Sequence, residues 1–284
     1  MDSNVFRIIN EEPDLFGKNL MISIMPDRIC GKYPFSVGIL IPTIRKESML
    51  TSLISLSNSS FSSMMELIIV VDNDKEEYDY LAKSFLLNSN LNKNFLSVKM
   101  IFSSKRLYSV AAFNEAYKNC ESYFFCWMND ENTYEHSWLI KSLNNFSKTF
   151  SDGVGVLTLC GKKKKSSLGL STKDFVRYNK GEWFYPGYKM NYCDDELACR
   201  AMLLGRYSYL GDSGVHHNSK ITEAFTGYNS DEEKIGFKKA DRSVFYKRSE
   251  TNFDLPVNRI YPWNSKTNYH ITYPLKEKDF FLDE

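Results

Sequence analysis

The sequence predicts an α/β protein in which helices flank a mainly parallel sheet. Three observations lead to this fold class. Short apolar runs of strand length alternate with longer segments of helical periodicity through the first half of the chain. Two of these runs, at 66–72 and 123–128, lead into acidic residues, where a buried strand would leave the core. The 284 residues are enough for one large α/β domain or two small ones, with a sizeable core.

Composition narrows the class of protein. Hydrophobic residues make up 43% of the chain and aromatic residues 15%, which is typical of a globular protein. The net charge of +1 argues against nucleic-acid binding through bulk charge. The six cysteines form no C-x-x-C pair, so we expect reduced thiols and no zinc site. Residues 1–19 lack a signal-peptide pattern and no apolar run reaches membrane-spanning length, so we expect a cytoplasmic protein with at most peripheral contact at the inner face of a membrane.

The first elements form a βαβ unit. Residues 37–43 are an apolar strand with a proline near its exit, and residues 47–56 carry apolar side chains at helical spacing. Residues 66–72 are a second buried strand that ends on Asp72. A strand, a helix and a strand in this order predict parallel pairing.

The same alternation continues to the middle of the chain. We expect a helix over 78–87, a strand over 98–102, a helix over 109–118 and an aromatic-rich strand over 123–128. The last strand runs into Asn129, Asp130 and Glu131. Ligands of open α/β sheets bind outside the carboxyl ends of strands, and neighbouring carboxylates suit a hard divalent cation. An acidic turn would show the same residues.

The second half is less regular. A helix over 137–150 and a strand over 153–159 precede a lysine-rich loop at 161–167, which is most simply a solvated loop and alternatively a patch for an anionic acceptor. An aromatic loop follows at 183–188. A helix over 194–205 then begins with three acids, which also suit the positive end of a helix dipole. After a short strand at 207–210 come His216 and His217, whose side chains point to opposite faces if the segment is extended.

Two parts of the chain lie outside this pattern. Residues 1–35 are an N-terminal extension without recognisable chemistry. Periodicity fades after residue 224, so we expect residues 225–284 to form an irregular C-terminal tail that packs on the domain. No G-x-G-x-x-G or G-x-x-x-x-G-K-[ST] motif follows a strand, which argues against a dinucleotide dehydrogenase or a P-loop enzyme.

Six motifs in a fixed order resemble the glycosyltransferases of the GT-A fold, and family 2, the large inverting group, most of all. The motifs are Gly38-Ile39-Leu40-Ile41-Pro42-Thr43, Val70-Val71-Asp72, Ser109-Val110-Ala111-Ala112-Phe113-Asn114-Glu115-Ala116, Met128-Asn129-Asp130-Glu131, Asp194-Asp195-Glu196-Leu197 with Arg200, and Gly214-Val215-His216-His217. The resemblance implies a GT-A domain over 36–224, with a nucleotide-binding half at about 36–132 and an acceptor half at about 133–224. Because each motif is common, the order carries the inference.

The resemblance also implies roles for single residues on the donor side. Asp130 and Glu131 would hold Mn²⁺ or Mg²⁺, with His217 or His216 as a further ligand. Pro42 and Thr43 would line the pocket of the nucleobase that Asp72 reads, and Arg106 would approach the base or the diphosphate. Asn114 would also belong to the nucleotide-sugar site. Asn129 departs from the usual first acid of the motif and is placed near the ribose.

On the acceptor side, Asp194 or Asp195 would be the general base that deprotonates the attacking hydroxyl. Counting back from Arg200 selects Asp194, while the double acid itself points to Asp195. Trp183 and Tyr185 would stack on the acceptor sugar; packing of the loop is the alternative.

The resemblance thus predicts an inverting, metal-dependent transfer from a nucleotide-sugar, with a UDP-sugar favoured, to a glycan or lipid-linked acceptor in surface polysaccharide synthesis. Two alternatives stay open. A sugar nucleotidyltransferase would need a glycine-rich basic motif after the first strand, and this chain has no glycine there. A catalytically degenerate GT-A binding or scaffold protein would be consistent with Asn129.

Overall fold

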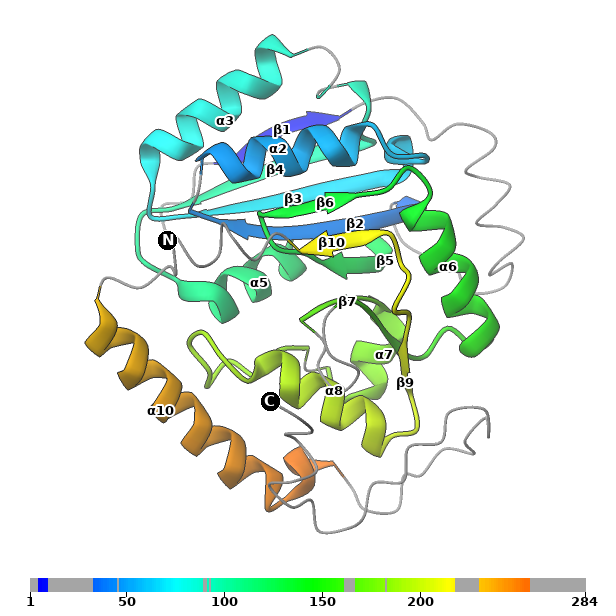
Figure 1. The fold of residues 1–284 in the computed structure, drawn as a ribbon, viewed down its shortest axis with the longest axis vertical. Helices are drawn as coiled ribbons and strands as arrows, with labels where there is room; N and C mark the ends of the chain where they lie inside the picture. Colours follow the sequence, from blue (N-terminus) through cyan, green and yellow to red (C-terminus); the bar gives the residue numbers. More distant parts are fainter. Residues whose placement is uncertain are drawn as a thin grey trace.

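The computed structural model describes residues 5–9, 33–44, 46–88, 91, 93–160, 167–181, 183–217 and 230–255 (Figure 1). An eight-stranded sheet with the order β1-β4-β3-β2-β5-β8-β7-β9 forms its centre. Strands β4, β3, β2 and β5 run parallel to one another, and β1 and β8 add antiparallel strands on either side of them. The bounds of the sheet strands are β1 Val5–Ile9, β2 Tyr33–Thr43, β3 Met65–Asp72, β4 Ser97–Ser103, β5 Ser122–Trp127, β7 Val156–Cys160, β8 Leu168–Thr172 and β9 Tyr207–Tyr209.

Helices cover both faces of this sheet. The alternation of strand side chains separates two cores, since Leu67 and Ile69 of β3 enter one of them and Ile68 and Val70 enter the other. The first core is covered by α2, α3 and α6, and the second by α5, α7, α8 and α10 (Figure 1). The helix bounds are α2 Lys46–Ser57, α3 Lys75–Leu87, α5 Tyr108–Lys118, α6 Trp138–Thr149, α7 Lys173–Tyr178, α8 Cys193–Leu203 and α10 Asp231–Ser249, with short 3₁₀ turns at Ser62–Met64 and Asn252–Asp254.

The predicted α/β class with a mainly parallel, helix-flanked sheet is confirmed, and each strand and helix expected between residues 37 and 159 is present within a few residues. The sequence did not reveal β8 and α7, nor the small separate sheet of β6 (Asn132–Tyr134) and β10 (Val215–His217). The predicted irregular tail is corrected in part, because residues 231–249 form the long helix α10. The lysine run at 162–165, most of the N-terminal extension and residues 256–284 lie outside the described residues.

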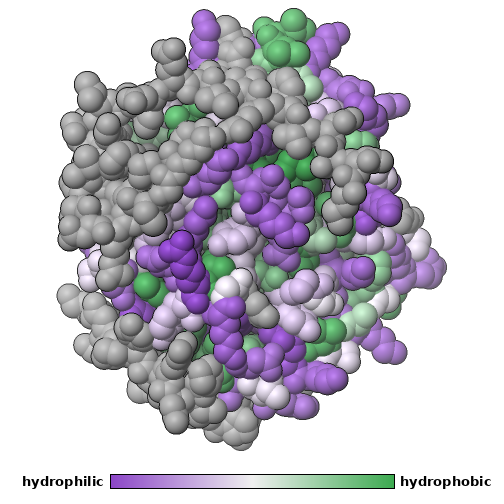
Figure 2. Space-filling view, turned by 180° about the vertical axis from the view of Figure 1, so that it is seen from behind, coloured by the Kyte–Doolittle hydropathy of each residue, from purple (hydrophilic) through white to green (hydrophobic). Residues whose placement is uncertain are grey.

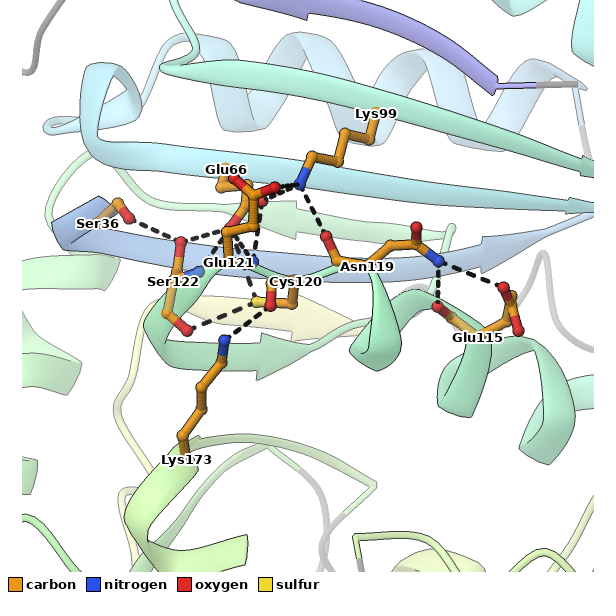
Figure 3. Close-up of polar contacts among 9 residues, drawn as sticks. All are labelled: Ser36, Glu66, Lys99, Glu115, Asn119, Cys120, Glu121, Ser122 and Lys173. Atoms are coloured by element: carbon orange, nitrogen blue, oxygen red, sulfur yellow. Dashed lines mark hydrogen bonds and ion pairs between the residues drawn. The ribbon is translucent and has the colours of Figure 1, made fainter. Parts of the chain in front are cut away.

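A buried polar network joins the strands at the end of the sheet opposite the acidic motif (Figure 3). Glu66, at the start of β3, is fully buried and binds the Lys99 ammonium of β4 at 2.8 Å. Its carboxylate also accepts bonds from the backbone N–H groups of Glu121 and Ser122 and from the Ser122 hydroxyl. Lys173 of α7 donates to the Cys120 carbonyl at 2.8 Å. The turn between α5 and β5 is therefore fixed to β3 and to α7, which helps to set the position of β5.

Candidate active site

The ends of the parallel strands bring two predicted donor-side residues, Thr43 and Asp130, together with Glu77 of α3 at one edge of the sheet. Thr43 is the last residue of β2. Asp130 lies just beyond the end of β5, the strand that pairs with β2. The Thr43 hydroxyl lies 2.9 Å from the Asp130 carboxylate and 2.7 Å from that of Glu77. All three side chains are buried. Pro42 and Asn129 are half-buried at the same edge.

Glu77 is a residue that the sequence analysis missed. It lies in the first turn of α3, where Asp74 accepts a hydrogen bond from the Glu77 N–H at 2.8 Å. The spacing of an aspartate and a glutamate three residues later is typical of a helix capping box, which accounts for both acids without any site. In the structure Asp74 caps the helix, and the Glu77 carboxylate accepts a hydrogen bond from the Thr43 hydroxyl. The spacing of Asp74 and Glu77 was therefore visible in the sequence, but helix capping explained it without a functional site.

Asp72 anchors the next part of the edge. Its carboxylate accepts bonds from the backbone N–H groups of Leu107 at 2.6 Å and Tyr108 at 2.9 Å, where α5 begins. Arg106 forms an ion pair with it at 2.9 Å. A carboxylate at the positive end of a helix is stabilised by the helix dipole. Asp72 therefore positions both Arg106 and the start of α5 through direct contacts.

The pairing of β6 with β10 brings a histidine to the acidic motif. In this register His217 lies opposite Asn132, next in the chain to Glu131. The His217 Nε2 atom lies 2.8 Å from the Glu131 carboxylate. His216 points to the other face, as alternation requires, and its Nε2 atom lies 3.2 Å from the exposed Glu135. Hydrogen bonds from Lys141 first, and then from His216, lower the pKa of Glu135.

These residues suit a divalent cation in their chemistry. Carboxylate oxygens and an imidazole nitrogen are ligands that Mn²⁺ accepts, and Mg²⁺ takes the carboxylates. Asp130 and Glu131 are each 4% exposed, so both carboxylates are largely shielded from water. In the described part of the chain, however, no three side chains of His, Cys, Asp or Glu already lie in a metal-binding cluster. Of the two histidines predicted as ligands, only His217 faces these acids.

The acids at the start of α8 lie on the other face of the sheet from α2 and α3. The Ser167 hydroxyl donates to the Asp194 carboxylate at 3.1 Å, and both Asp194 and Asp195 are half-buried. Glu196 is different, because it is 1% exposed and points into the protein. In the first turn of α8, only Asp194 and Asp195 are partly exposed to solvent. Both therefore stay candidates for the general base that the sequence predicts.

Glu196 is held by a cluster that the sequence analysis did not anticipate. Arg248 of α10 binds it with two hydrogen bonds of 2.9 and 2.8 Å, and the Tyr188 hydroxyl donates to it at 2.7 Å. Arg200, one turn later on α8, lies 3.5 Å away. Burial raises the pKa of Tyr188, and the negative charge of Glu196 raises it further, so the phenol stays a neutral donor. No sequence signal linked Arg248 to this acid, since 52 residues separate them.

The aromatic loop lies between α5 and α8. Asn114 donates to the Phe184 carbonyl at 3.0 Å, which fixes the loop to α5. Trp183 is 3% exposed and its ring stacks on Phe184 with centroids 4.2 Å apart. Tyr185 is half-buried, and the Arg248 guanidinium covers one face of its ring at 3.6 Å. In this arrangement Trp183 packs in the core, and Tyr185 is the more exposed of the two.

A model of the family described as glycosyl transferase family 2 matches residues 38–210 of this chain, more than half of its length. The chain belongs to glycosyl transferase family 2. The resemblance drawn from the six motifs is thereby confirmed, and the protein is a glycosyltransferase. The family 2 match lies inside the predicted domain of residues 36–224, whose exact limits stay a prediction. No curated protein matches the sequence.

Solved structures agree with the family 2 assignment at the level of the fold. TarS from S. aureus, residues 1–349 in complex with UDP-GlcNAc, has a TM-score of 0.54 at 14% identity over 78% of this chain and 68% of that one. Mannosyltransferase PcManGT from Pyrobaculum calidifontis, in complex with GDP-Man and Mn²⁺, has a TM-score of 0.51 at 13% identity over 70% of this chain and 61% of that one. The chain thus spans about three fifths of the mannosyltransferase. The fold is GT-A.

In the described ranges, no helix has the length and apolar character needed to cross a membrane.

Proposed function

We propose that this family 2 protein is an inverting, metal-dependent glycosyltransferase that moves a sugar from a nucleotide-sugar to a glycan or a lipid-linked acceptor in surface polysaccharide synthesis. The observation that carries the proposal is the joining of Thr43 to Asp130 and of Glu131 to His217 at the carboxyl edge of the sheet. Two GT-A relatives support a nucleotide-sugar donor, because TarS is solved with UDP-GlcNAc and PcManGT with GDP-Man and Mn²⁺. We favour a UDP-sugar.

On the donor side, Asp72 and Arg106 would face the nucleobase beside Pro42 and Thr43. Asn129 would contact the ribose and Asn114 would support the sugar pocket through its bond to Phe184. Asp130, Glu131 and His217 would hold Mn²⁺ or Mg²⁺, which when bound neutralises the diphosphate leaving group. His216 is left outside this set by its contact with Glu135.

On the acceptor side, Asp194 would accept the proton of the attacking hydroxyl, with Asp195 as the second candidate. Ser167 holds the Asp194 carboxylate in one orientation, which suits a base that must meet its substrate in a fixed geometry. Tyr185 would contact the acceptor sugar and Trp183 would support the loop from within. The acceptor attacks the anomeric carbon from the side opposite the leaving diphosphate, which inverts its configuration.

The test is release of nucleotide from UDP-, dTDP- and GDP-sugars with Mn²⁺ or Mg²⁺, by the wild type and by Asp194→Asn and Asp195→Asn. Loss of a general base slows turnover about 10²- to 10⁴-fold. We expect that loss for Asp194→Asn and a change within about fivefold for Asp195→Asn, which serves as the matched control. The reverse pattern would move the base to Asp195. Equal turnover in all three proteins would show that neither acid is the base. Nucleotide-induced thermal stabilisation without turnover would favour the binding-protein alternative, and absence of both would exclude the proposal.

A further inference from the structure

Helix α10 turns one face toward the segment that leads into α8. Asp241, Phe245 and Arg248 are the buried residues of this 19-residue helix, and their spacing of four and three places them on one side. Figure 1 shows α10 as the long gold helix beside α8. We call these three residues the inner face of α10. Because only these three residues of α10 are buried, this helix binds the domain through a few specific contacts.

The first contact fixes a turn of backbone. The Asp241 carboxylate is 1% exposed and accepts three consecutive backbone N–H bonds, from Lys189 at 2.9 Å, Met190 at 2.9 Å and Asn191 at 2.8 Å. Bonds to an ionised acceptor are stronger than bonds between neutral groups. Three successive amides thus converge on one carboxylate of α10, which holds residues 189–191 together with the bond from the Val110 N–H of α5 to the Lys189 carbonyl at 3.2 Å.

The second contact lies at the first residue before α8. Tyr192 has a φ of 66°, in the left-handed region that a non-glycine residue adopts only when its surroundings hold it there. Its ring packs on Phe245 at a centroid distance of 5.4 Å. The chain enters α8 through this residue, so its conformation sets the direction in which Asp194 and Asp195 leave the first turn.

The third contact lies one turn further along. Arg248 binds both oxygens of Glu196, and the planar geometry of the pair fixes orientation as well as distance. The guanidinium also covers the ring of Tyr185. The inner face of α10 thus holds the acceptor loop, the entry to α8 and the first turn of α8 at once.

We propose that Asp241 is a positioning residue for the reaction: through residues 189–191 it aims the start of α8, and with it the carboxylate that deprotonates the acceptor. This inference rests on the proposed function, because it assigns the base to α8. It predicts that a change at Asp241 affects the acceptor side while the donor edge at Thr43 and Asp130 is unaffected. The other end of α10 does reach toward Asp72, because Glu233 accepts a hydrogen bond from the Tyr108 hydroxyl and the Tyr108 N–H binds Asp72. A helix that merely covered apolar surface would have no such one-sided effect.

The experiment uses the full chain carrying Asp241→Asn, which keeps the size of the side chain and removes its charge. Lys239→Ala, on the exposed side of the same helix, is the control. Amide hydrogen exchange is followed over residues 185–197 and over β3, and nucleotide release is measured with the donor on which the wild type is most active. In Asp241→Asn we expect the amides of residues 189–197 to exchange about tenfold faster than in the wild type, while exchange in β3 is unchanged. We also expect kcat to fall about 10- to 100-fold, with UDP affinity in the presence of Mn²⁺ within about twofold of wild type.

The proposal is overturned if exchange at 189–197 is unchanged, or if kcat and UDP affinity fall together. If Asp241→Asn does not fold, Arg248→Lys replaces it, because lysine keeps the charge and loses the paired bonds to Glu196; the same separation of kcat from UDP affinity is then expected. Should the wild type release nucleotide from no donor, the proposed function fails, and the exchange measurement alone still decides whether Asp241 holds the start of α8.

Discussion

The single hydroxyl of Thr43 connects two carboxylates that the sequence places 53 positions apart, at 77 and 130. A hydroxyl has one proton and can donate it to one of the two acceptors at a time. Placing three buried oxygen groups together at a strand end costs stability unless they are hydrogen-bonded, and such costs are common at functional sites. At the residue scale, this junction is where the donor edge is most sensitive to substitution.

We expect Thr43→Val to lower the free energy of unfolding by about 1–3 kcal/mol, because valine has the same shape and leaves the carboxylates without this donor. Urea denaturation measures the change. Thr43→Ser keeps the hydroxyl and should cost less than valine does. A valine variant as stable as wild type would mean that the hydroxyl contributes nothing to holding Asp130.

The two adjacent histidines offer a sharper comparison for the proposed metal site. We expect His217→Ala to raise the Mn²⁺ concentration needed for half-maximal stabilisation by UDP about tenfold or more, since its ring faces Glu131. His216→Ala is the control and should change it by less than about twofold, since that ring faces Glu135. Thermal unfolding at a series of Mn²⁺ concentrations provides the readout. Equal effects would argue that neither histidine is a ligand.

Single residues were predicted well where local pattern and site coincided. Asp130 and Asp72 follow apolar strands, so their place at the carboxyl edge follows from the βα alternation. The choice between His216 and His217 depended on pairing with β6. This strand has only three residues of mixed polarity, so it could not be recognised from the sequence. Glu77 and Glu196 were hidden because first-turn acids have an ordinary explanation in helix capping and dipoles.

At the scale of elements, the strands were predicted because they are buried on both faces and therefore read as continuous apolar runs. Helix α10 was missed for the opposite reason, since its inner face has only three buried residues, two of them charged. Its start did carry a signal: Ser230 accepts a bond from the Glu233 N–H at 3.1 Å, in a serine-to-glutamate spacing typical of a capping box.

Strand β2 approaches the turn before β5 so closely that only glycine fits at one point. A Cβ atom on Gly38 would lie 2.3 Å from the Cys120 sulfur. We expect Gly38→Ala to lower the free energy of unfolding by about 1–3 kcal/mol through overpacking. Adding Cys120→Ala removes the sulfur and should recover part of the loss, which a double-mutant cycle in urea measures. No recovery would place the strain elsewhere.

At the scale of the whole molecule, the two ends of the parallel strands differ in role: one end carries the proposed site, and the other carries a stabilising network. The carboxyl ends of the parallel strands carry the proposed donor site, and the amino ends carry the buried Glu66 network (Figure 3). The surface gives little further guidance: the face in Figure 2 mixes hydrophilic and hydrophobic side chains, and the exposed large hydrophobic residues of the described ranges are spread over α2, α3 and α10.

We expect Lys99→Met to lower the free energy of unfolding by about 3–5 kcal/mol, because it leaves the Glu66 carboxylate buried without its cation. UDP affinity of the folded fraction should stay unchanged, since the network lies at the far end of the sheet. Lys118→Met, at a largely exposed lysine, is the control and should change stability by less than about 0.5 kcal/mol. A small effect at Lys99 would show that the backbone N–H bonds to Glu66 suffice.

The pairing of β6 with β10 also has a consequence for folding. Its strands are three residues long, and its contact between Glu135 and His216 joins positions 81 residues apart. Closing so long a loop is entropically costly, and so short a ladder returns few hydrogen bonds. His217 should therefore reach Glu131 late in folding and leave it early in local opening, well before the sheet melts. A ligand that bridges the two side chains would slow that opening, so the exchange rate of the β10 amides should report occupancy of the site directly.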